Sequence, residues 1–177
     1  MATNPDRPHS NCYWVQPGQL LAGEYPGSFS EAQARQKLQL ILEAGVTFFL
    51  DLTESHELRP YADLVEEAAK ARDITVELRR LSIRDGDIPK SPQEMVKILD
   101  TIDEALAAGH TVYVHCWGGI GRTGTVIGCH LVRHGKRGEE ALEEIALWWQ
   151  TIEKRHRHPR SPETDAQVDY ILNWREP

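Results

Sequence analysis

The fold is decided by the stretch Val112-Tyr113-Val114-His115-Cys116-Trp117-Gly118-Gly119-Ile120-Gly121-Arg122-Thr123-Gly124. Its first residues are β-branched and aromatic, which predicts a short buried strand. The glycines that follow predict a turn, and the apolar residues 125–132 predict a buried helix that stops at Gly135. A glycine-rich turn between a strand and a helix N-terminus presents backbone N–H groups and the positive end of a helix dipole. The stretch therefore predicts a binding site for an anion.

A cysteine and an arginine bracket this turn. Backbone N–H donors and a helix N-terminus favour the thiolate of Cys116, which is the nucleophilic form of the side chain. The planar guanidinium of Arg122 can bind two phosphoryl oxygens at once. We expect Thr123 to hold its hydroxyl near the sulfur and to ease the departure of the sulfur as a leaving group. The pattern indicates attack of Cys116 on phosphorus, followed by hydrolysis of a cysteinyl-phosphate.

Two other interpretations compete for the same residues. Residues 119–124 fit the dinucleotide-binding pattern G-x-G-x-x-G, which also needs an acidic residue about 20 positions later at the end of a second strand. Residues 139–150 have a helical pattern instead, with no strand beneath it. Alternatively, Cys116 is a buried core thiol at the end of a strand. That interpretation leaves the glycines and Arg122 without an explanation.

His115-Cys116 followed by Arg122-Thr123 resembles the signature loop of the cysteine-dependent protein tyrosine and dual-specificity phosphatases. The form Cys-Trp-Gly-Gly-Ile-Gly-Arg is most similar to the cyclin-dependent-kinase-associated phosphatases and their bacterial relatives. Residues 20–26 and 51–54 resemble stretches of the same family. In the low-molecular-weight phosphatases and arsenate reductases a similar loop lies near the N-terminus, whereas here it lies in the C-terminal half.

The resemblance implies a role for each residue of the loop. Phosphate is expected to lie against the backbone of Trp117, Gly118, Gly119, Ile120, Gly121 and Arg122. His115 is expected to orient the loop through hydrogen bonds, and a hydrogen-bonded core histidine is the alternative from its place at the end of a buried strand. We expect neither a cofactor nor a metal, because a cysteine–arginine mechanism needs no cation and the histidines do not cluster with cysteines or carboxylates at ligand spacing.

A phosphatase of this kind also needs a general acid on a mobile loop, to protonate the leaving oxygen. Residues 83–89 form a candidate loop with two carboxylates, Asp85 and Asp87. Chemistry alone leaves both open, because either carboxylate can protonate an oxygen within hydrogen-bond reach. The resemblance implies Asp85, since the family's acid stands four residues before a proline. Asp87 is then a turn former or a hydrogen-bond acceptor, and an exposed acidic turn with no role in catalysis is the third interpretation.

The rest of the chain alternates strands and helices. We expect strands over 13–15, 19–22, 46–50, 74–81 and 112–114, and helices over 28–44, 60–72, 91–108, 125–132, 137–154 and 162–174, the last behind a Ser161-Pro162 cap. This order predicts an α/β fold with a mostly parallel central sheet flanked by helices on both faces. The resemblance makes it the cysteine-phosphatase, dual-specificity-like fold. The reactive turn lies at the carboxyl end of a strand, where open α/β sheets bind ligands.

Length and composition narrow the setting. The 177 residues suit a single domain over 11–177, and the polar residues 1–10 with two prolines predict a flexible tail rather than a secretory signal. A formal charge of −7 provides no basic surface for nucleic acid or an anionic membrane. No apolar run is long enough to cross a bilayer. Three cysteines do not form a disulfide framework, and a thiolate enzyme suits a reducing cytoplasm.

Three features outside the loop have open roles. Gln167 is either a helix-surface residue, which base rates favour, or a residue that positions water or the loop, as the resemblance implies. The basic run 154–160 is either a solvated loop or a surface facing an anionic substrate. Cys129 is expected to pack in the core, and a protective disulfide with Cys116 is the alternative.

These observations predict a phosphoric monoester hydrolase whose partners are phosphorylated proteins or small phosphomonoesters. Phosphotyrosine is the expected substrate, and the unknown depth of the pocket leaves phosphoserine and phosphothreonine open. Hydrolysis of inositol phosphates or phosphoinositides is one alternative, although residues 117–121 lack the lysines that such relatives carry. A non-catalytic pseudophosphatase that binds phosphoresidues is another, although it has no need for Cys116, Arg122 and an acid. The oligomeric state is left open.

Overall fold

The structure is a computed structural model, and it describes residues 6–177. Its centre is a five-stranded sheet in the order β1-β2-β5-β3-β4. The strands are β1 Cys12–Gln16, β2 Leu20–Gly23, β3 Phe48–Asp51, β4 Glu77–Arg80 and β5 Val112–His115. β1 pairs antiparallel with β2, and every other pairing is parallel. The predicted, mostly parallel α/β sheet is confirmed.

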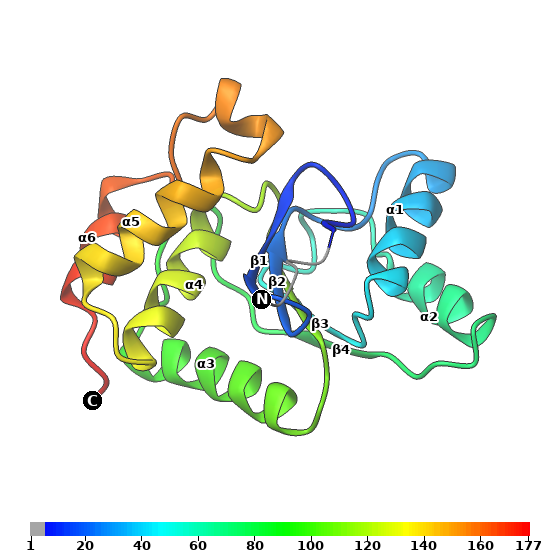
Figure 1. The fold of residues 1–177 in the computed structure, drawn as a ribbon, viewed down its shortest axis with the longest axis horizontal. Coiled ribbons are helices and arrows are strands. Elements are labelled where there is room, and N and C mark those ends of the chain that lie inside the picture. Colours follow the sequence, from blue (N-terminus) through cyan, green and yellow to red (C-terminus); the bar gives the residue numbers. More distant parts are fainter. Residues whose placement is uncertain (1–5) are drawn as a thin grey trace.

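Helices cover both faces of this sheet (Figure 1). They are α1 Glu31–Glu43, α2 Ala62–Lys70, α3 Pro92–Ala107, α4 Gly121–Arg133, α5 Gly138–Trp149 and α6 Asp165–Asn173, with a short 3-10 helix, η1, over Glu153–His156. α1 and α2 cover one face, and the other helices gather on the opposite face (Figure 1).

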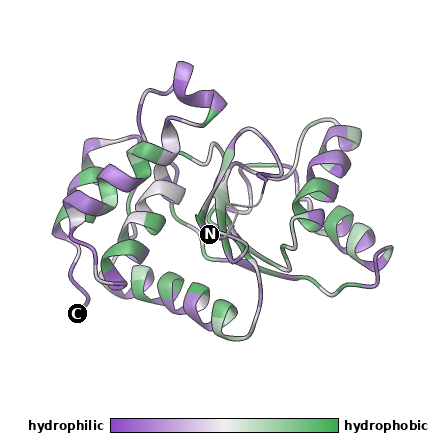
Figure 2. Ribbon diagram, viewed as in Figure 1, coloured by the Kyte–Doolittle hydropathy of each residue, from purple (hydrophilic) through white to green (hydrophobic). Residues whose placement is uncertain are grey.

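β5 lies in the middle of the sheet and is buried on both faces. Val112 and Val114 pack into one hydrophobic cluster with residues of α3 and α4. Tyr113 packs into the other cluster, which includes Leu38 of α1 and Val65 of α2. A strand covered on both sides has apolar residues at every position, which explains the unbroken apolar run in the sequence. Figure 2 shows the apolar residues concentrated on the sheet and on the helix surfaces that face it.

Several helix boundaries differ from the prediction, and three of these differences bear on the site or have a clear local reason. α4 begins at Gly121 rather than at 125, because Gly121, Arg122 and Gly124 already belong to its first turn. α5 ends at Trp149 rather than at 154, and the chain continues into η1. α6 begins after Thr164, whose hydroxyl accepts from the N–H of Gln167 while the Gln167 side chain accepts from the N–H of Thr164. This capping box takes the place of the expected Ser161-Pro162 cap.

The expected tail over 1–10 falls in part on residues 1–5, which lie outside the described residues. The next residues are held by hydrogen bonds. Nη1 of Arg7 donates to the carbonyl oxygens of Cys12 and Thr151, at 3.2 and 3.0 Å. The Ser10 hydroxyl donates to Glu153, at 2.6 Å. Residues 7–10 are therefore fastened to β1 and to the segment after α5, in contrast to a loose tail.

Over residues 6–177, no helix combines the length and the apolar composition that crossing a membrane requires.

Candidate active site

The loop between β5 and α4 is held from outside through its carbonyl groups. The carbonyl oxygen of Trp117 accepts from the N–H of Tyr25, at 2.9 Å, and that of Gly118 accepts from Nζ of Lys154, at 3.1 Å. The carbonyl oxygen of Ile120 accepts from the Ser161 hydroxyl, at 2.8 Å. In a trans peptide the C=O and the next N–H point in opposite directions. Three donors outside the loop therefore turn the N–H groups of Gly118, Gly119 and Gly121 toward its interior.

Gly119 makes the tight turn of this loop possible. Its φ is +71°, a conformation that glycine adopts without steric cost. It also lies directly against the end of β2, since a Cβ added here would be 2.4 Å from the carbonyl carbon of Gly23. A residue with a side chain would be strained at this φ, and its Cβ would clash with the backbone of Gly23. The loop is thus fitted closely against a neighbouring strand of the sheet.

Arg122, at the start of α4, is 1% exposed and is held by two carboxylates. Its Nη1 and Nη2 donate to the two carboxylate oxygens of Glu57, at 2.6 and 2.9 Å. Nη1 also donates to the carbonyl oxygen of Ile83, at 3.0 Å, and Nη2 lies 2.9 Å from Oδ1 of Asp85. Burial acts to lower the pKa of Arg122, but the Glu57 hydrogen bonds and the charges of Cys116, Glu57 and Asp85 raise it overall.

Two polar atoms in the first turn of α4 stay unpaired within residues 6–177. The Nε of Arg122 and the Oγ1 of Thr123 are buried and have no hydrogen-bond partner. A buried N–H without a partner costs free energy, so such groups indicate that a ligand completes the site. The free Nε–H and the inward backbone N–H groups are donors, which suits an anion. Cys116, 2% exposed, lies at the start of the same loop.

His115 belongs to a buried hydrogen-bond network behind the loop. Its Nε2 and the hydroxyl of Tyr61 form a hydrogen bond of 2.7 Å. Its Nδ1 lies 3.4 Å from the carbonyl oxygen of Cys116 and 3.9 Å from Oδ1 of Asp51. Burial lowers the pKa of His115, so the ring is neutral at pH 7. This geometry fits a histidine that orients the loop and is itself a hydrogen-bonded core residue.

The two candidate acids occupy different positions. Asp85 is exposed, yet its carboxylate reaches Arg122. The carboxylate of Asp87 instead accepts from the N–H of Ile88, at 2.9 Å, and its backbone oxygen accepts from Nε2 of Gln167, at 3.1 Å. The fold therefore brings Asp85 to the loop and turns the Asp87 carboxylate to its own backbone.

Gln167 is fully buried, so the interpretation as a helix-surface glutamine is wrong. Its side chain joins the cap of α6 to the acid loop through Thr164 and Asp87. It also packs against the start of α4, since a Cβ at Gly121 would lie 2.8 Å from both of its terminal side-chain atoms. The packing explains why a glutamine at this helix start faces inward.

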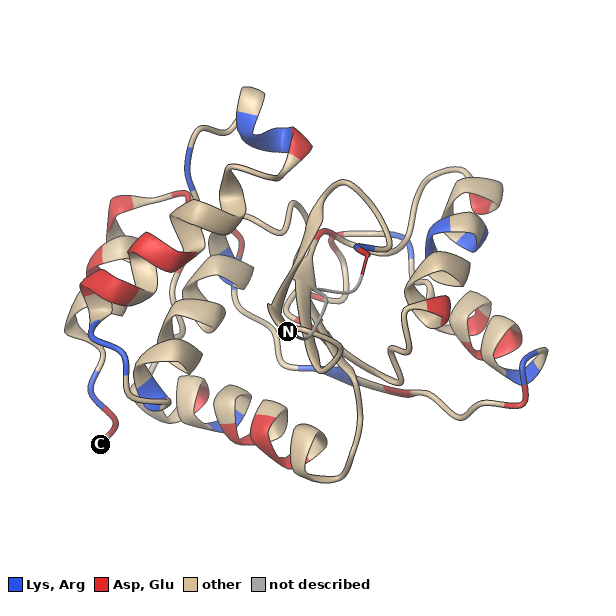
Figure 3. Cartoon of the chain, in the orientation of Figure 1, with Lys and Arg blue, Asp and Glu red and all other residues tan. Residues whose placement is uncertain are grey.

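The basic run 154–160 divides into parts with different environments. Lys154 lies 2.6 Å from Glu24 and also binds the loop at Gly118. Arg160 pairs with Asp165 at the surface, at 2.6 Å. Figure 3 shows this basic segment after the acidic α5. Cys129, by contrast, is buried in the core as expected, and the cysteines are free thiols.

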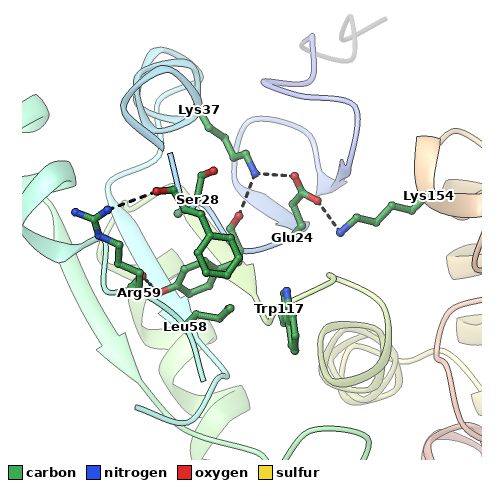
Figure 4. Close-up of a pocket in the computed structure, with 10 residues that line it drawn as sticks. Glu24, Ser28, Lys37, Leu58, Arg59, Trp117 and Lys154 are labelled. Atoms are coloured by element: carbon green, nitrogen blue, oxygen red, sulfur yellow. Dashed lines mark hydrogen bonds and ion pairs between the residues drawn. The ribbon is translucent and has the colours of Figure 1, made fainter. Parts of the chain in front are cut away.

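A cavity of about 210 Å³, open to solvent, lies beside Trp117 of the loop. Trp117 and Phe29, which are 54% and 90% exposed, line it together with Leu58. Figure 4 shows Lys37 and Lys154 reaching the same carboxylate, Glu24, with N–O distances of 2.7 and 2.6 Å. The cavity thus offers aromatic and apolar surface, while its two lysines are already paired.

Glu57 and Tyr61 are the site residues that sequence reasoning missed. Glu57 fixes the guanidinium of Arg122, and Tyr61 fixes His115. Both follow the stretch 51–54 that already resembled the phosphatase family, which was the available signal. Nothing in their own spacing marks them, because their partners lie 65 and 54 residues away.

A family model described as "Polymorphic toxin system, DSP-PTPase phosphatase" matches residues 24–136, which is well over half of the chain. The chain belongs to this family. The resemblance of His115-Cys116 and Arg122-Thr123 to the cysteine-dependent tyrosine and dual-specificity phosphatases is thereby confirmed.

Curated relatives of this chain include viral and animal phosphatases. The putative tyrosine phosphatase 067L of Invertebrate iridescent virus 3 is 29% identical over 99 residues, which cover 54% of this chain and 38% of the viral protein. The dual specificity protein phosphatase CDC14B of Mus musculus is 36% identical over 82 residues, covering 45% of this chain and 15% of the mouse protein. The chain therefore spans well under half the length of these relatives.

Solved structures share the fold of this chain. Tk-PTP in its active form is 27% identical, with a TM-score of 0.65 and coverage of 87% of this chain and 90% of that one. The kinase associated phosphatase KAP has a TM-score of 0.69 at 17% identity, covering 86% and 83%, and at that identity the likeness concerns the fold alone. The predicted dual-specificity-like fold is confirmed.

Proposed function

We propose that residues 11–177 form one phosphatase domain that hydrolyses phosphotyrosine through a cysteinyl-phosphate. The observation that carries the proposal is the loop whose carbonyls are held outward by Tyr25, Lys154 and Ser161. Its inward N–H groups and the unpaired Nε of Arg122 form a set of donors for a phosphoryl group, next to a cysteine.

The reaction then proceeds in two balanced steps. In the first, the Cys116 thiolate attacks phosphorus, an S–P bond forms, and the bond to the leaving oxygen breaks while Asp85 gives that oxygen a proton. In the second, Asp85 takes a proton from water, the water oxygen attacks phosphorus, and the S–P bond breaks. The loop donors and Arg122 bind the same phosphoryl oxygens throughout, and Glu57 keeps the guanidinium in place.

The setting of the reaction is proposed on similar grounds. Three free cysteines and a nucleophilic thiolate suit a reducing compartment such as the cytoplasm. No step of this mechanism uses a metal ion.

The cavity beside the loop supports phosphotyrosine over more highly charged substrates. An aromatic ring can pack against Trp117 and Phe29, whereas a second phosphate would have to compete with Glu24 for Lys37 and Lys154. The structure of PTPMT1 in complex with PI(5)P shares this fold at 22% identity, with a TM-score of 0.65. The fold therefore accommodates the inositol-lipid alternative, and the experiment compares the two substrate classes.

A phosphotyrosine peptide is expected to be hydrolysed with a kcat/KM at least roughly tenfold above that of an inositol phosphate or a phosphoserine peptide. The release of phosphate is measured for all three substrates.

Phe29→Ala should lower kcat/KM for the phosphotyrosine peptide roughly threefold to tenfold, because the phosphotyrosine ring loses an aromatic contact. Leu147→Ala is the matched control, since Leu147 is also an exposed apolar residue but does not line the cavity. A preference for the inositol phosphate would assign the site to the alternative.

Asp85→Asn is expected to lower kcat roughly 100-fold or more for aryl phosphates with poor leaving groups, and far less for those with good ones. A good leaving group departs without a proton, so it does not need the acid. The measurement is kcat across a series of substituted phenyl phosphates. Asp87→Asn provides the control, because its carboxylate binds its own loop backbone rather than Arg122. The opposite result for the two variants would make Asp87 the acid.

A further inference from the structure

Three metal-ligand side chains meet at the far end of α4, away from the phosphate loop. Asp103 lies on α3, His130 lies on α4, and His134 caps the C-terminus of α4. One ligand atom from each lies within 4.8 Å of the other two. The expectation that the histidines do not cluster with carboxylates is wrong here. His130 and His134 are four residues apart on one helix face, and the carboxylate comes from a neighbouring helix.

His130 is the residue that indicates a missing ligand. Its side chain is 1% exposed, and neither ring nitrogen has a hydrogen-bond partner among residues 6–177. A buried imidazole with two unpaired nitrogens is costly, because a buried polar group normally has a partner. An imidazole nitrogen with a free lone pair is a common ligand for metal ions.

Asp103 presents one oxygen to both histidines. Its Oδ1 lies 3.0 Å from Nε2 of His134 and 3.7 Å from Nδ1 of His130. Its other oxygen, Oδ2, accepts from Nη1 of Arg133 at 3.0 Å, which fixes the orientation of the carboxylate. Metal–ligand bonds of about 2.0–2.2 Å in a tetrahedral site separate the ligand atoms by roughly 3.3–3.6 Å. The two distances from Oδ1 bracket this range, and the three ligand atoms all lie within 4.8 Å of one another.

We propose that Asp103, His130 and His134 bind one Zn²⁺ ion, with solvent as its fourth ligand. Imidazole nitrogen and carboxylate oxygen are ligands that zinc favours. The His134 side chain is 48% exposed, which leaves room for water and for entry of the ion. With a rise of about 1.5 Å per residue, His130 stands roughly 12 Å along α4 from Arg122. The ion would therefore not touch the substrate; it would join α3 to the helix that carries the loop.

Metal binding is tested on the full chain carrying Cys116→Ser, which removes the active-site thiol as a competing ligand. Calorimetric titration with Zn²⁺ is expected to give saturable binding of one ion per chain, and added Zn²⁺ should raise the melting temperature, because it binds the folded state. His134→Ala should abolish both the binding and the rise in melting temperature. Because the His134 side chain is exposed, this variant is expected to stay folded. Asp103→Asn, which keeps the side-chain volume, should weaken binding strongly.

His156→Ala is the control, because His156 is exposed and lies outside the cluster. Binding and thermal shift that match the parent in this variant, together with their loss in His134→Ala, support the site. Saturable binding that survives in His134→Ala and Asp103→Asn would overturn the proposal. So would the absence of saturable binding to the parent.

Discussion

Cys116→Ser is expected to abolish phosphotyrosine hydrolysis while leaving phosphopeptide binding intact. Serine keeps the shape of the side chain but is far less ionised than a thiol, so it cannot act as the nucleophile in the same loop. Removing a nucleophile from an enzyme typically lowers kcat by about 10⁴-fold or more. Release of phosphate from an aryl phosphate measures turnover, and fluorescence anisotropy with a labelled phosphotyrosine peptide measures binding.

Cys12→Ser is the matched control for this substitution. Cys12 is also buried, its Sγ donates to the carbonyl oxygen of His9, and a serine hydroxyl can keep that hydrogen bond. Burial raises the pKa of Cys12 to about 11, so it stays protonated at neutral pH. The control should retain activity. If the unsubstituted chain binds the peptide but releases no phosphate, and Cys116→Ser binds equally well, the chain is a pseudophosphatase.

Gly119→Ala is expected to lower the free energy of unfolding by roughly 2–5 kcal/mol and to remove most of the activity. A positive φ costs a residue with a side chain about 1–2 kcal/mol, and forcing a methyl group into a packed site costs about 1–3 kcal/mol more. Here the new Cβ would lie 2.4 Å from the carbonyl carbon and 2.6 Å from the carbonyl oxygen of Gly23. Both are backbone atoms of β2, which cannot move aside as a flexible side chain can.

Gly135→Ala separates these two contributions. Gly135 has a φ of +100°, but a Cβ added there meets no described heavy atom within 4 Å. We expect Gly135→Ala to lower the free energy of unfolding only by the cost of the positive φ, about 1–2 kcal/mol, and to retain activity. Urea unfolding gives the stabilities, and kcat/KM for an aryl phosphate gives the activity. Equal losses in the two variants would contradict close packing between the loop and β2.

The parts of the fold that follow from neighbouring residues were predictable from the sequence. The strand before Cys116, the helix start at Ser91 and the stop signals at Gly45, Gly109 and Gly135 act within a few residues. The same is true of the phosphate loop, because its glycines, cysteine and arginine are adjacent in the chain. Periodicity placed the helix ends less accurately, as the early end of α5 shows.

The roles that the sequence left open depend on contacts between residues that are distant in the chain. Asp85 and Asp87 look alike by chemistry, and only the fold shows which carboxylate lies at Arg122. Nothing in the sequence distinguishes Glu57 from other polar residues. It contacts Arg122 because β3, which precedes it, and β5, which precedes Arg122, are adjacent in the sheet. The buried side chain of Gln167 donates a hydrogen bond to the backbone oxygen of Asp87, which lies 80 residues earlier. The pattern Thr164-x-x-Gln167 was the one local signal, and it predicts a cap rather than burial.

The contacts that hold the phosphate loop limit how far the chain can be truncated. Gly23 precedes the stretch that matches the family model, and Ser161 and Gln167 lie well beyond its end. A fragment trimmed to residues 24–136 would keep Cys116, Arg122 and Asp85. It would nevertheless lose the strand that backs the turn and the hydroxyl that tethers Ile120. The stretch that is similar to relatives thus contains the proposed reacting groups. The shortest fragment that keeps the supports of the loop extends further, from the β1–β2 hairpin to α6.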